Sequence, residues 1–299
     1  MNASVRLLER TLPSIATLRA TVPEAHPSAQ ILGTERMGSG TLVGADGLIL
    51  TVTYVVLGAD SIEVTLLDDK TYEAELVAQD FHSGLAVVRI PVSDQPAVRL
   101  QAGSQLSVGQ EVFILASLGG AQRRANTGAI SSLDPFDAYW EYRLDRGIFT
   151  TAMNPGLGGG GLFTLDGTLA GVVSLDFNEV GRFTLAIPVD HFHDHRDELL
   201  RHGRRVSRPP RAWVGLYCYV LREHVVIAGI VPGSPAERAG LKAGDVVVAM
   251  NELRISERQG LYTGLWEHKP GEVVTFRVFR GNAVREVPVE TTDVEAFFA

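Results

Sequence analysis

Short apolar runs alternate with turn residues through roughly the first 200 residues of the chain. The run at 38–56 holds two apolar stretches around Asp46-Gly47, a dipeptide typical of β-hairpin turns. The run at 62–80 repeats this pattern, with Asp68, Asp69 and Lys70 as its turn. Many short strands without long helices between them predict a mainly β fold, an antiparallel barrel or sandwich. The further strand-like runs are 85–90, 111–118, 125–133, 147–153, 161–165, 168–175 and 182–188.

Helical spacing is confined to short segments at the two ends of this region. Apolar residues between Val5 and Leu12 fit a short amphipathic helix, which Pro13 ends or redirects, and 14–22 then forms a first strand. Residues 24–34 have no periodicity and are predicted to be a loop. The charged segment 188–201 is predicted to be a terminal helix.

A change in composition separates this region from a second one. Residues 201–211, RHGRRVSRPPR, contain five arginines and two prolines and no core pattern, so they indicate a linker. A small basic docking patch is the alternative for this stretch. From Trp213 onward the pattern predicts two strands, a turn with a short helix, a further strand, a helix at 256–268 and two final strands.

Composition and charge narrow the class of protein. The chain has 299 residues, 45% of them hydrophobic and 21% charged, which is typical of a globular protein with a core that needs no disulfide or metal. Its net charge of -8 argues against nucleic acid or an anionic membrane as a partner. The single cysteine, Cys218, excludes an intramolecular disulfide. We therefore expect that the chain does not bind nucleic acid. We also expect that it has no membrane-spanning segment.

The N-terminal segment bears on the compartment. Arg6, Glu9 and Arg10 interrupt its apolar residues, so no signal-peptide core is visible and the expected location is cytoplasmic. A location outside the cytoplasm, in the periplasm, is the alternative if a signal upstream of this sequence is missing.

The glycine-dense stretch Asn154–Leu162, NPGLGGGGL, lies between the strand at 147–153 and the strand–turn–strand pattern LFTLDGTLAGVVSL. This arrangement resembles the nucleophile loop of the HtrA (Deg) family of trypsin-like serine proteases, which reads NPGNSGGPL. At the matching positions this chain has Leu157, Gly158 and Gly161, and Gly158 replaces the nucleophilic serine. Glycine has no side chain that could be acylated.

The resemblance extends to the other two catalytic positions. The stretch TVTYVVLGAD resembles the family's segment around the catalytic histidine and has Tyr54 there, and SGLAVVRI has Gly84 where the family has its aspartate. A phenol with a pKa near ~10 is a poor proton acceptor at neutral pH, and hydrolysis by this mechanism needs all three groups. The resemblance therefore implies a pseudoprotease, not an enzyme, with degenerate triad positions at Tyr54, Gly84 and Gly158.

Two other arrangements could restore chemistry to the chain. His82 and Ser83 flank Gly84, and a relocated nucleophile there would make a serine-type endopeptidase of the HtrA type. His191 and His195 are four residues apart and would share one face of a helix, as metal ligands do, against a background of solvated histidines. We expect no metal and no cofactor.

By the same resemblance, the backbone amides of Gly156 and Gly158 are the remnant of an oxyanion hole. Four successive glycines also make such a loop expensive to hold rigid. A preformed anion site and a floppy remnant therefore both stay open.

The second region resembles a PDZ domain of the kind that HtrA proteins carry after the protease. The resemblance lies in WVGL, PGSPAERAGLKAGDVVVAMN and PGEVVTFRVFRG, in that order. PDZ domains add an extended peptide to a sheet edge and bind its terminal carboxylate. Leu261 and Leu265 either line the side-chain pocket or pack wholly into the core. The peptide-binding residues that the resemblance implies are Trp213, Val214, Gly215, Leu216, Tyr217, Tyr219, Leu261 and Leu265.

Together these features predict a chymotrypsin-like double β-barrel followed by a PDZ domain. The predicted division is a protease-fold domain at 1–200, the basic linker at 201–211, the PDZ domain at 212–292 and a tail at 293–299. The expected partners are peptides or unfolded segments with apolar C-termini. A homo-oligomer, or a hetero-oligomer with an active HtrA relative, is a further expectation. The N-terminal part of the chain has few aromatic residues, which argues against a trimer.

Overall fold

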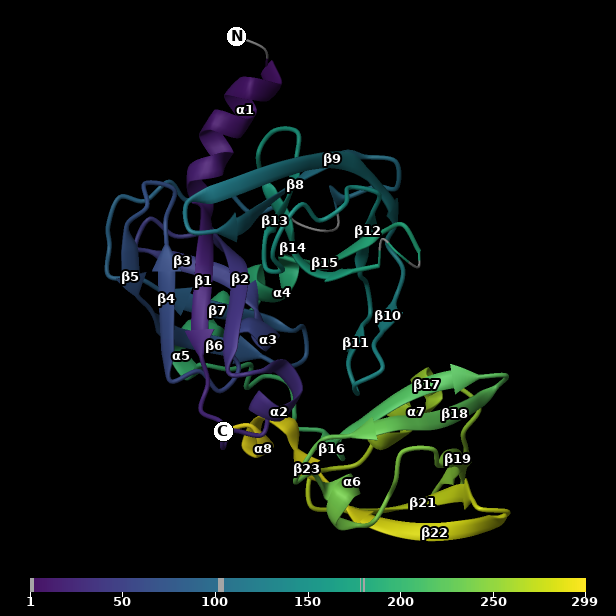
Figure 1. The fold of residues 1–299 in the computed structure, drawn as a ribbon. Coiled ribbons are helices and arrows are strands. Elements are labelled where there is room, and N and C mark those ends of the chain that lie inside the picture. The colour runs from purple at the N-terminus through teal and green to yellow at the C-terminus, as the bar shows by residue number, and fades with distance from the viewer. Residues whose placement is uncertain (1–2, 102–104, 178, 180) are drawn as a thin grey trace. The chain divides into compact units, whose positions relative to one another are not determined.

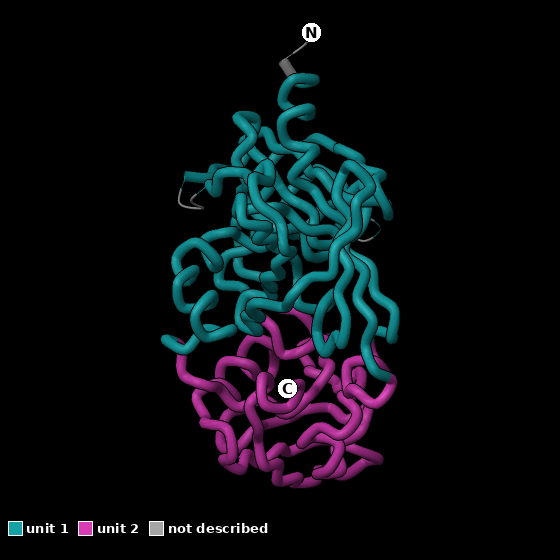
Figure 2. The backbone as a smooth tube through the Cα atoms, turned by 90° about the vertical axis from the view of Figure 1, so that its left-hand side faces the viewer, with its two compact units in different colours: residues 1–23, 32–136, 144–207 teal, residues 24–31, 137–143, 208–299 magenta. Residues whose placement is uncertain are grey.

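The chain folds into two compact units, coloured separately in Figure 2. The computed structural model describes residues 3–101, 105–177, 179 and 181–299. Unit 1 contains 1–23, 32–136 and 144–207, and unit 2 contains 24–31, 137–143 and 208–299. Unit 2 thus takes two short segments from the N-terminal two thirds of the chain, which the sequence division did not anticipate.

The first half of unit 1 is a seven-stranded antiparallel sheet with the order β5-β4-β1-β2-β3-β7-β6 (Figure 1). Thr41 pairs with Leu50 across the β2–β3 hairpin, as the Asp-Gly turn predicts. The helix α1 projects from unit 1 (Figures 1 and 2), and Arg10 near its end donates to the Asp166 carbonyl. The elements are α1 (Ala3–Thr11), η1 (Leu12–Ser14), β1 (Ile15–Thr21), α2 (Ala29–Leu32), β2 (Glu35–Leu42), β3 (Leu48–Val52), α3 (Thr53–Val56), β4 (Ser61–Thr65), β5 (Thr71–Glu73), β6 (Glu75–Asp80) and β7 (Leu85–Arg89).

The second half of unit 1 is a closed barrel with the order β12-β15-β14-β13-β8-β9. Closure removes free sheet edges, and alternate side chains fill the interior, among them Ile114, Leu162 and Val173. The elements are β8 (Glu111–Gly119), β9 (Gln122–Ser132), β12 (Ile148–Thr150), β13 (Gly161–Thr164), β14 (Leu169–Asp176), β15 (Thr184–Pro188), α4 (Asp190–His193) and α5 (Arg196–His202).

Unit 2 is an antiparallel sheet with the order β17-β18-β19-β21-β22, in which β17 lies at an edge. Ser234 caps the short helix α6, because its Oγ accepts from the Glu237 amide. The elements are β10 (Phe136–Asp137), β11 (Arg143–Leu144), β16 (Ala212–Trp213), β17 (Leu216–Leu221), β18 (His224–Ile230), α6 (Pro235–Arg238), β19 (Val246–Met250), β20 (Leu253–Arg254), α7 (Arg258–Leu265), β21 (Val273–Arg280), β22 (Ala283–Glu290), β23 (Thr292–Asp293) and α8 (Val294–Phe297), with β10 and β11 reaching one residue each into unit 1.

The predicted mainly β fold, with two β-rich halves and a following smaller unit, is confirmed. The prediction of one helix at 188–201 is wrong in detail, because the chain forms α4 and α5 with a break at Asp194–His195. The residues at 293–299 include α8, whose Phe297 ring lies 4.7 Å from the Trp213 ring between centroids.

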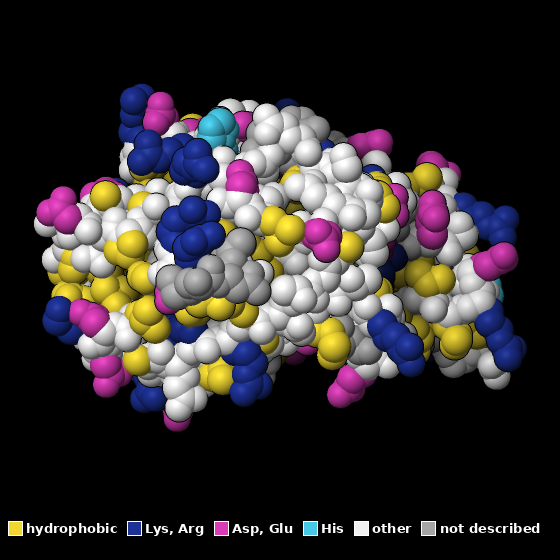
Figure 3. Space-filling view, turned by 90° about the horizontal axis from the view of Figure 1, so that it is seen from above, with side chains coloured by type: hydrophobic (Ala, Val, Ile, Leu, Met, Phe, Trp, Pro, Cys, Tyr) yellow, Lys and Arg dark blue, Asp and Glu magenta, His cyan; other side chains and the backbone are white. Residues whose placement is uncertain are grey.

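Surface charge and helix length can be compared with what the composition predicts. On the face shown in Figure 3, Lys and Arg side chains are interspersed with Asp, Glu and apolar side chains, so this face carries charge of both signs. Within the described residues, every helix is too short or too polar to cross a bilayer.

Cys218 offers a probe of the integrity of unit 2. Its side chain is fully buried in the core of that unit, and burial raises the pKa of the thiol to about 12. Since the thiolate is the reactive form, we predict negligible labelling by a thiol reagent at pH 8 in the native chain and labelling of one thiol per chain in urea. Labelling of the native chain as fast as that of the unfolded chain would contradict this packing.

Candidate functional site

Tyr54 and Gly158 meet inside unit 1. Tyr54 lies in α3 directly after β3, and its hydroxyl donates to the Ser174 carbonyl at 2.7 Å. A Cβ atom built on Gly158 would lie 2.0 Å from the Tyr54 hydroxyl oxygen, far closer than non-bonded atoms approach. The phenol therefore occupies the volume that any side chain at position 158 would need, and burial raises the pKa of Tyr54 above its ordinary value.

Gly84 lies next to these two positions through strand pairing. Val52 pairs with Leu85 between β3 and β7, and the Thr53 amide donates to the Gly84 carbonyl at 2.8 Å. The fold thus brings the three predicted positions Tyr54, Gly84 and Gly158 to one region. The side chains there are a phenol and two hydrogen atoms, which supply neither an imidazole nor a carboxylate.

The glycine-dense loop is held by hydrogen bonds on both sides. The Gly158 carbonyl accepts from the Ser39 amide at 2.7 Å, and the Leu157 carbonyl accepts from the Ser39 hydroxyl at 2.8 Å. The Gly159 amide donates to the Val173 carbonyl at 2.7 Å. These bonds favour a fixed loop over a floppy one.

The predicted oxyanion-hole remnant has its own internal acceptor. The Gly156 amide faces the Asn154 side-chain oxygen at 3.4 Å, and the Asn154 side-chain amide donates to the Gly156 carbonyl at 2.8 Å. Asn154 therefore fixes the orientation of the peptide group at Gly156, as a local Asx turn does.

Two buried serines of unit 1, the candidate Ser83 and also Ser117, have structural partners. Ser83 is fully buried and donates to the Asp80 carboxylate at 2.6 Å. Ser117 is also fully buried and shares a hydrogen bond with the Thr17 hydroxyl.

One serine–imidazole hydrogen bond occurs in unit 2. His26 Nδ1 and the Ser28 hydroxyl are 2.7 Å apart, while His26 Nε2 contacts the Phe298 carbonyl at 3.1 Å. Ser28 is 1% exposed, which leaves no access for a substrate. The pair ties the 24–31 segment to the C-terminal residues of the same unit.

The histidines at 191 and 195 do not share a helical face. His191 belongs to α4, whereas His195 precedes α5 with a φ of -120°, outside helical geometry. The described residues contain no group of three His, Cys, Asp or Glu side chains placed to hold a metal ion.

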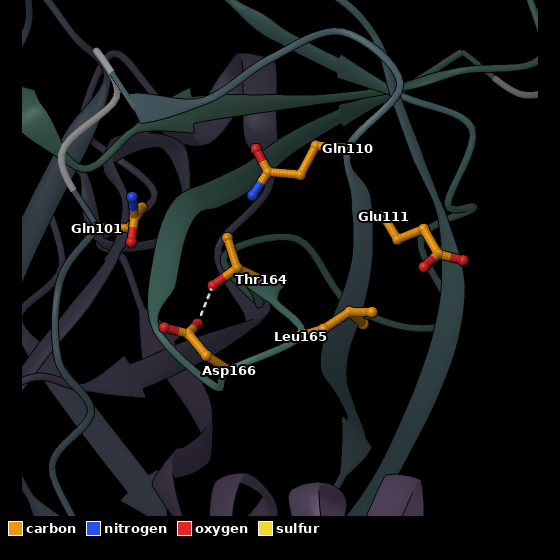
Figure 4. A pocket seen from close by; sticks show the side chains of 6 residues that line it. All are labelled: Gln101, Gln110, Glu111, Thr164, Leu165 and Asp166. Carbon is orange, nitrogen blue, oxygen red and sulfur yellow. Dashed lines mark hydrogen bonds between the residues drawn. The ribbon is translucent and has the colours of Figure 1, made fainter.

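A surface pocket of unit 1 lies apart from the three positions (Figure 4). Thr164 donates to the Asp166 carboxylate inside it, and this hydrogen bond lowers the pKa of Asp166. Its lining residues include none of the candidate positions. They come from β8, from β13, from the residues next to these strands and from the connection between β7 and β8: Gln101, Gln110, Glu111, Thr164, Leu165 and Asp166.

The predicted peptide-binding residues of unit 2 divide into two groups. β17, with Tyr217 and Tyr219, is an edge strand next to α7, the arrangement that peptide addition requires. Leu261 and Leu265 of α7, however, belong to the core cluster and are each 1% exposed. Trp213 is 7% exposed, and its ring packs against Phe297 and Phe298 and lies beside Gly215.

Sequence reasoning missed one occupant of this loop. The backbone amides of Val214, Gly215 and Leu216 donate to the carboxylate of Glu141. Glu141 precedes Val214 by 73 residues in the sequence. Gly215 has a φ of +87°, and a Cβ atom there would lie 2.4 Å from Ser234, so the loop requires glycine. The aromatic cluster Tyr139, Trp140 and Tyr142 around Glu141 was the available signal, because such a cluster is unusual in a solvated loop.

Comparison with known proteins finds two domain families in this chain. Residues 38–172 match the trypsin-like peptidase domain family, and residues 205–291 match the PDZ domain family. A "probable periplasmic serine endoprotease DegP-like" of Halomonas elongata is 33% identical over 287 residues, 89% of this chain and 59% of the relative. A protein of the same name from Hahella chejuensis is 31% identical over 277 residues, 87% of this chain and 57% of the relative. The chain belongs to the HtrA family.

A solved structure titled "HtrA-type protease AlgW with tripeptide" covers 98% of this HtrA-family chain at a TM-score of 0.60. The match covers 97% of that protein at 24% identity, so it concerns the fold alone. The HtrA-family chain spans under three fifths of the length of the two curated relatives.

The contact between Tyr54 and position 158 can be measured. We predict that Gly158→Ser lowers the free energy of unfolding by about 1–3 kcal/mol through overpacking. Adding Tyr54→Ala, which vacates the volume, should restore part of that loss in a double-mutant cycle followed by urea denaturation.

Gly260→Ser is the matched control for this cycle, since a Cβ atom there meets Glu257 only at an ordinary 3.6 Å. Its effect should be small. Strict additivity of Gly158→Ser and Tyr54→Ala would contradict the contact.

Proposed function

We propose that this HtrA-family protein is a catalytically inactive pseudoprotease that binds peptides or unfolded protein segments through its PDZ domain. In this proposal it acts as a scaffold, a chaperone-like binder or a regulatory partner in protein quality control. The observation that carries the proposal is the Tyr54 phenol in the volume beside Gly158, at the place where the family's nucleophile and base would meet. Substituting all three triad positions removes attack, proton transfer and orientation of the base together.

The names of the relatives favour a second candidate, a serine-type endopeptidase with a relocated nucleophile. The same names favour the periplasm as its compartment over the cytoplasm. The burial of Ser83 supports the first candidate over this one, because a nucleophilic hydroxyl must be accessible to a protein substrate.

The PDZ part of the proposal assigns residues 212–292 to peptide binding and 1–200 to the protease fold, with the basic 201–211 between them. The Glu141 carboxylate accepts hydrogen bonds from three backbone amides of the 214–216 loop. This supports the proposal that the loop recognises the carboxylate of a peptide. The proposal also includes a homo-oligomer of this chain or a hetero-oligomer with an active HtrA relative.

Catalytic inactivity has a direct test. We predict that the full chain neither cleaves unfolded casein nor reacts with a fluorophosphonate probe, with trypsin as the positive control, because no activated hydroxyl is available. Casein cleavage together with probe labelling, both lost in Ser83→Ala, would establish the endopeptidase instead.

Peptide binding is best tested by changing the ligand, because Leu265 lies in the core and Leu265→Lys would unfold the unit. We predict that peptides with an apolar last residue and a free carboxylate bind the full chain, by fluorescence anisotropy. The same peptides with a C-terminal amide should bind at least about tenfold more weakly, because hydrogen bonds to a charged group contribute about 1.5–3 kcal/mol. Equal affinity of both forms would show that the carboxylate is not recognised.

A further inference from the structure

The segment Asp137–Arg143 belongs to unit 2 by its contacts, although it lies between β9 and β12 in the sequence. Its Glu141 places a carboxylate in the 214–216 loop. Oε1 accepts from the Gly215 amide at 2.6 Å and from the Leu216 amide at 2.7 Å, and Oε2 accepts from the Val214 amide at 3.2 Å. A side-chain carboxylate thus makes the bonds that a peptide's terminal carboxylate would make.

The backbone of the same segment continues along the edge strand. The Cys218 amide donates to the Tyr139 carbonyl at 2.6 Å, two residues along β17 from the amide of Leu216. Alternate residues of a strand face the same edge, so Leu216 and Cys218 both present their amides to the segment. Carboxylate binding followed by a backbone bond two residues further on is the pattern of strand addition.

Side chains of α7 hold the upstream end of the segment. Tyr262 donates its hydroxyl to the Ala138 carbonyl at 2.9 Å, and Arg258 contacts the Asp137 carboxylate at 2.5 Å and the Asp137 carbonyl at 2.9 Å. β17, α7 and the 214–216 loop, which together form the peptide groove of a PDZ domain, therefore all contact this one segment.

Glu141 itself has two unusual properties. Its φ is +47°, in the left-handed region that non-glycine residues rarely adopt and that surrounding contacts must maintain. Its side chain belongs to a residue only 6% exposed, and burial raises the pKa of the carboxyl to about 7 against the lowering effect of the three amides. A strained backbone and a buried carboxyl are both explained by the position that Glu141 takes in the loop.

We propose that Asp137–Arg143 is an internal ligand that closes the peptide groove of unit 2, and that an external C-terminal peptide binds by displacing it. The proposal rests on the proposed peptide-binding function. Because a groove available for only a fraction of the time has its apparent affinity reduced by that fraction, removing Glu141 increases the affinity for external peptides.

The experiment compares Glu141→Ala with the unaltered full chain. The probe is a fluorescent peptide with an apolar last residue and a free carboxylate. A groove occupied about nine-tenths of the time predicts about tenfold tighter binding to the variant. Glu252→Ala, which removes an exposed carboxylate from the same unit, is the matched control and should leave the affinity unchanged.

A second arm supplies the segment in trans. The peptide FDAYWEYRL, with both ends blocked so that it has no terminal carboxylate, should bind Glu141→Ala, and its version with alanine for the glutamate should not. Asp137→Asn, which weakens the Arg258 contact at a half-buried site, should give a smaller gain in the same direction and serves if Glu141→Ala fails to fold.

The outcomes separate this inference from the proposed function. Equal affinity of the unaltered chain and both variants for the external peptide, with no binding of the blocked peptide, overturns the internal ligand and leaves peptide binding standing. Binding of the blocked peptide to Glu141→Ala, with no binding of any apolar-ended peptide, supports the internal ligand and overturns recognition of C-terminal peptides.

Discussion

The hydrogen bond from the Tyr54 hydroxyl to the Ser174 carbonyl holds the phenol opposite Gly158. It fixes the phenol in a buried position where the only residue that fits opposite is glycine. The strands around it are ordinary antiparallel pairings, and the glycine-dense loop is held by Ser39 and Val173. Packing and backbone hydrogen bonds therefore maintain this part of the fold, and they do not depend on which side chains occupy the three positions.

A second constraint operates in unit 2. Amides of a tight loop that point away from the sheet need an acceptor when water is excluded, because an unpaired buried amide is unfavourable. Glu141 supplies that acceptor for Val214, Gly215 and Leu216. The same property that makes the loop suited to a peptide carboxylate makes it suited to a carboxylate from the chain itself, so recognition and self-occupancy have one physical origin.

The two sites differed in how far residue patterns could predict them. Local motifs predicted Tyr54, Gly84 and Gly158 as the three triad positions, each next to a strand with a clear pattern, and their catalytic origin stays a prediction. In unit 2 the edge strand and the loop were predictable, yet Leu261 and Leu265 lie in the core and the Trp213 side chain packs on the tail. Helical spacing gives the face that a leucine shares with its neighbours, but not whether that face meets a ligand or the core. The shared helical face considered for His191 and His195 is absent because the helix breaks at Asp194–His195, which the residue spacing does not show.

The sequence by itself determined the mainly β fold, the order of the trypsin-like and PDZ regions, and the identity of Tyr54, Gly84 and Gly158, which have neither an imidazole nor a carboxylate. These features depend on local alternation, turn residues and residue identity, which are present in any stretch of chain. Only the tertiary structure decided that the phenol of Tyr54 fills the space beside Gly158, and that Glu141 enters the loop of unit 2. Both depend on side chains separated by about 70 residues or more in sequence, and no local pattern specifies such distant contacts because they arise from the packing of whole strands.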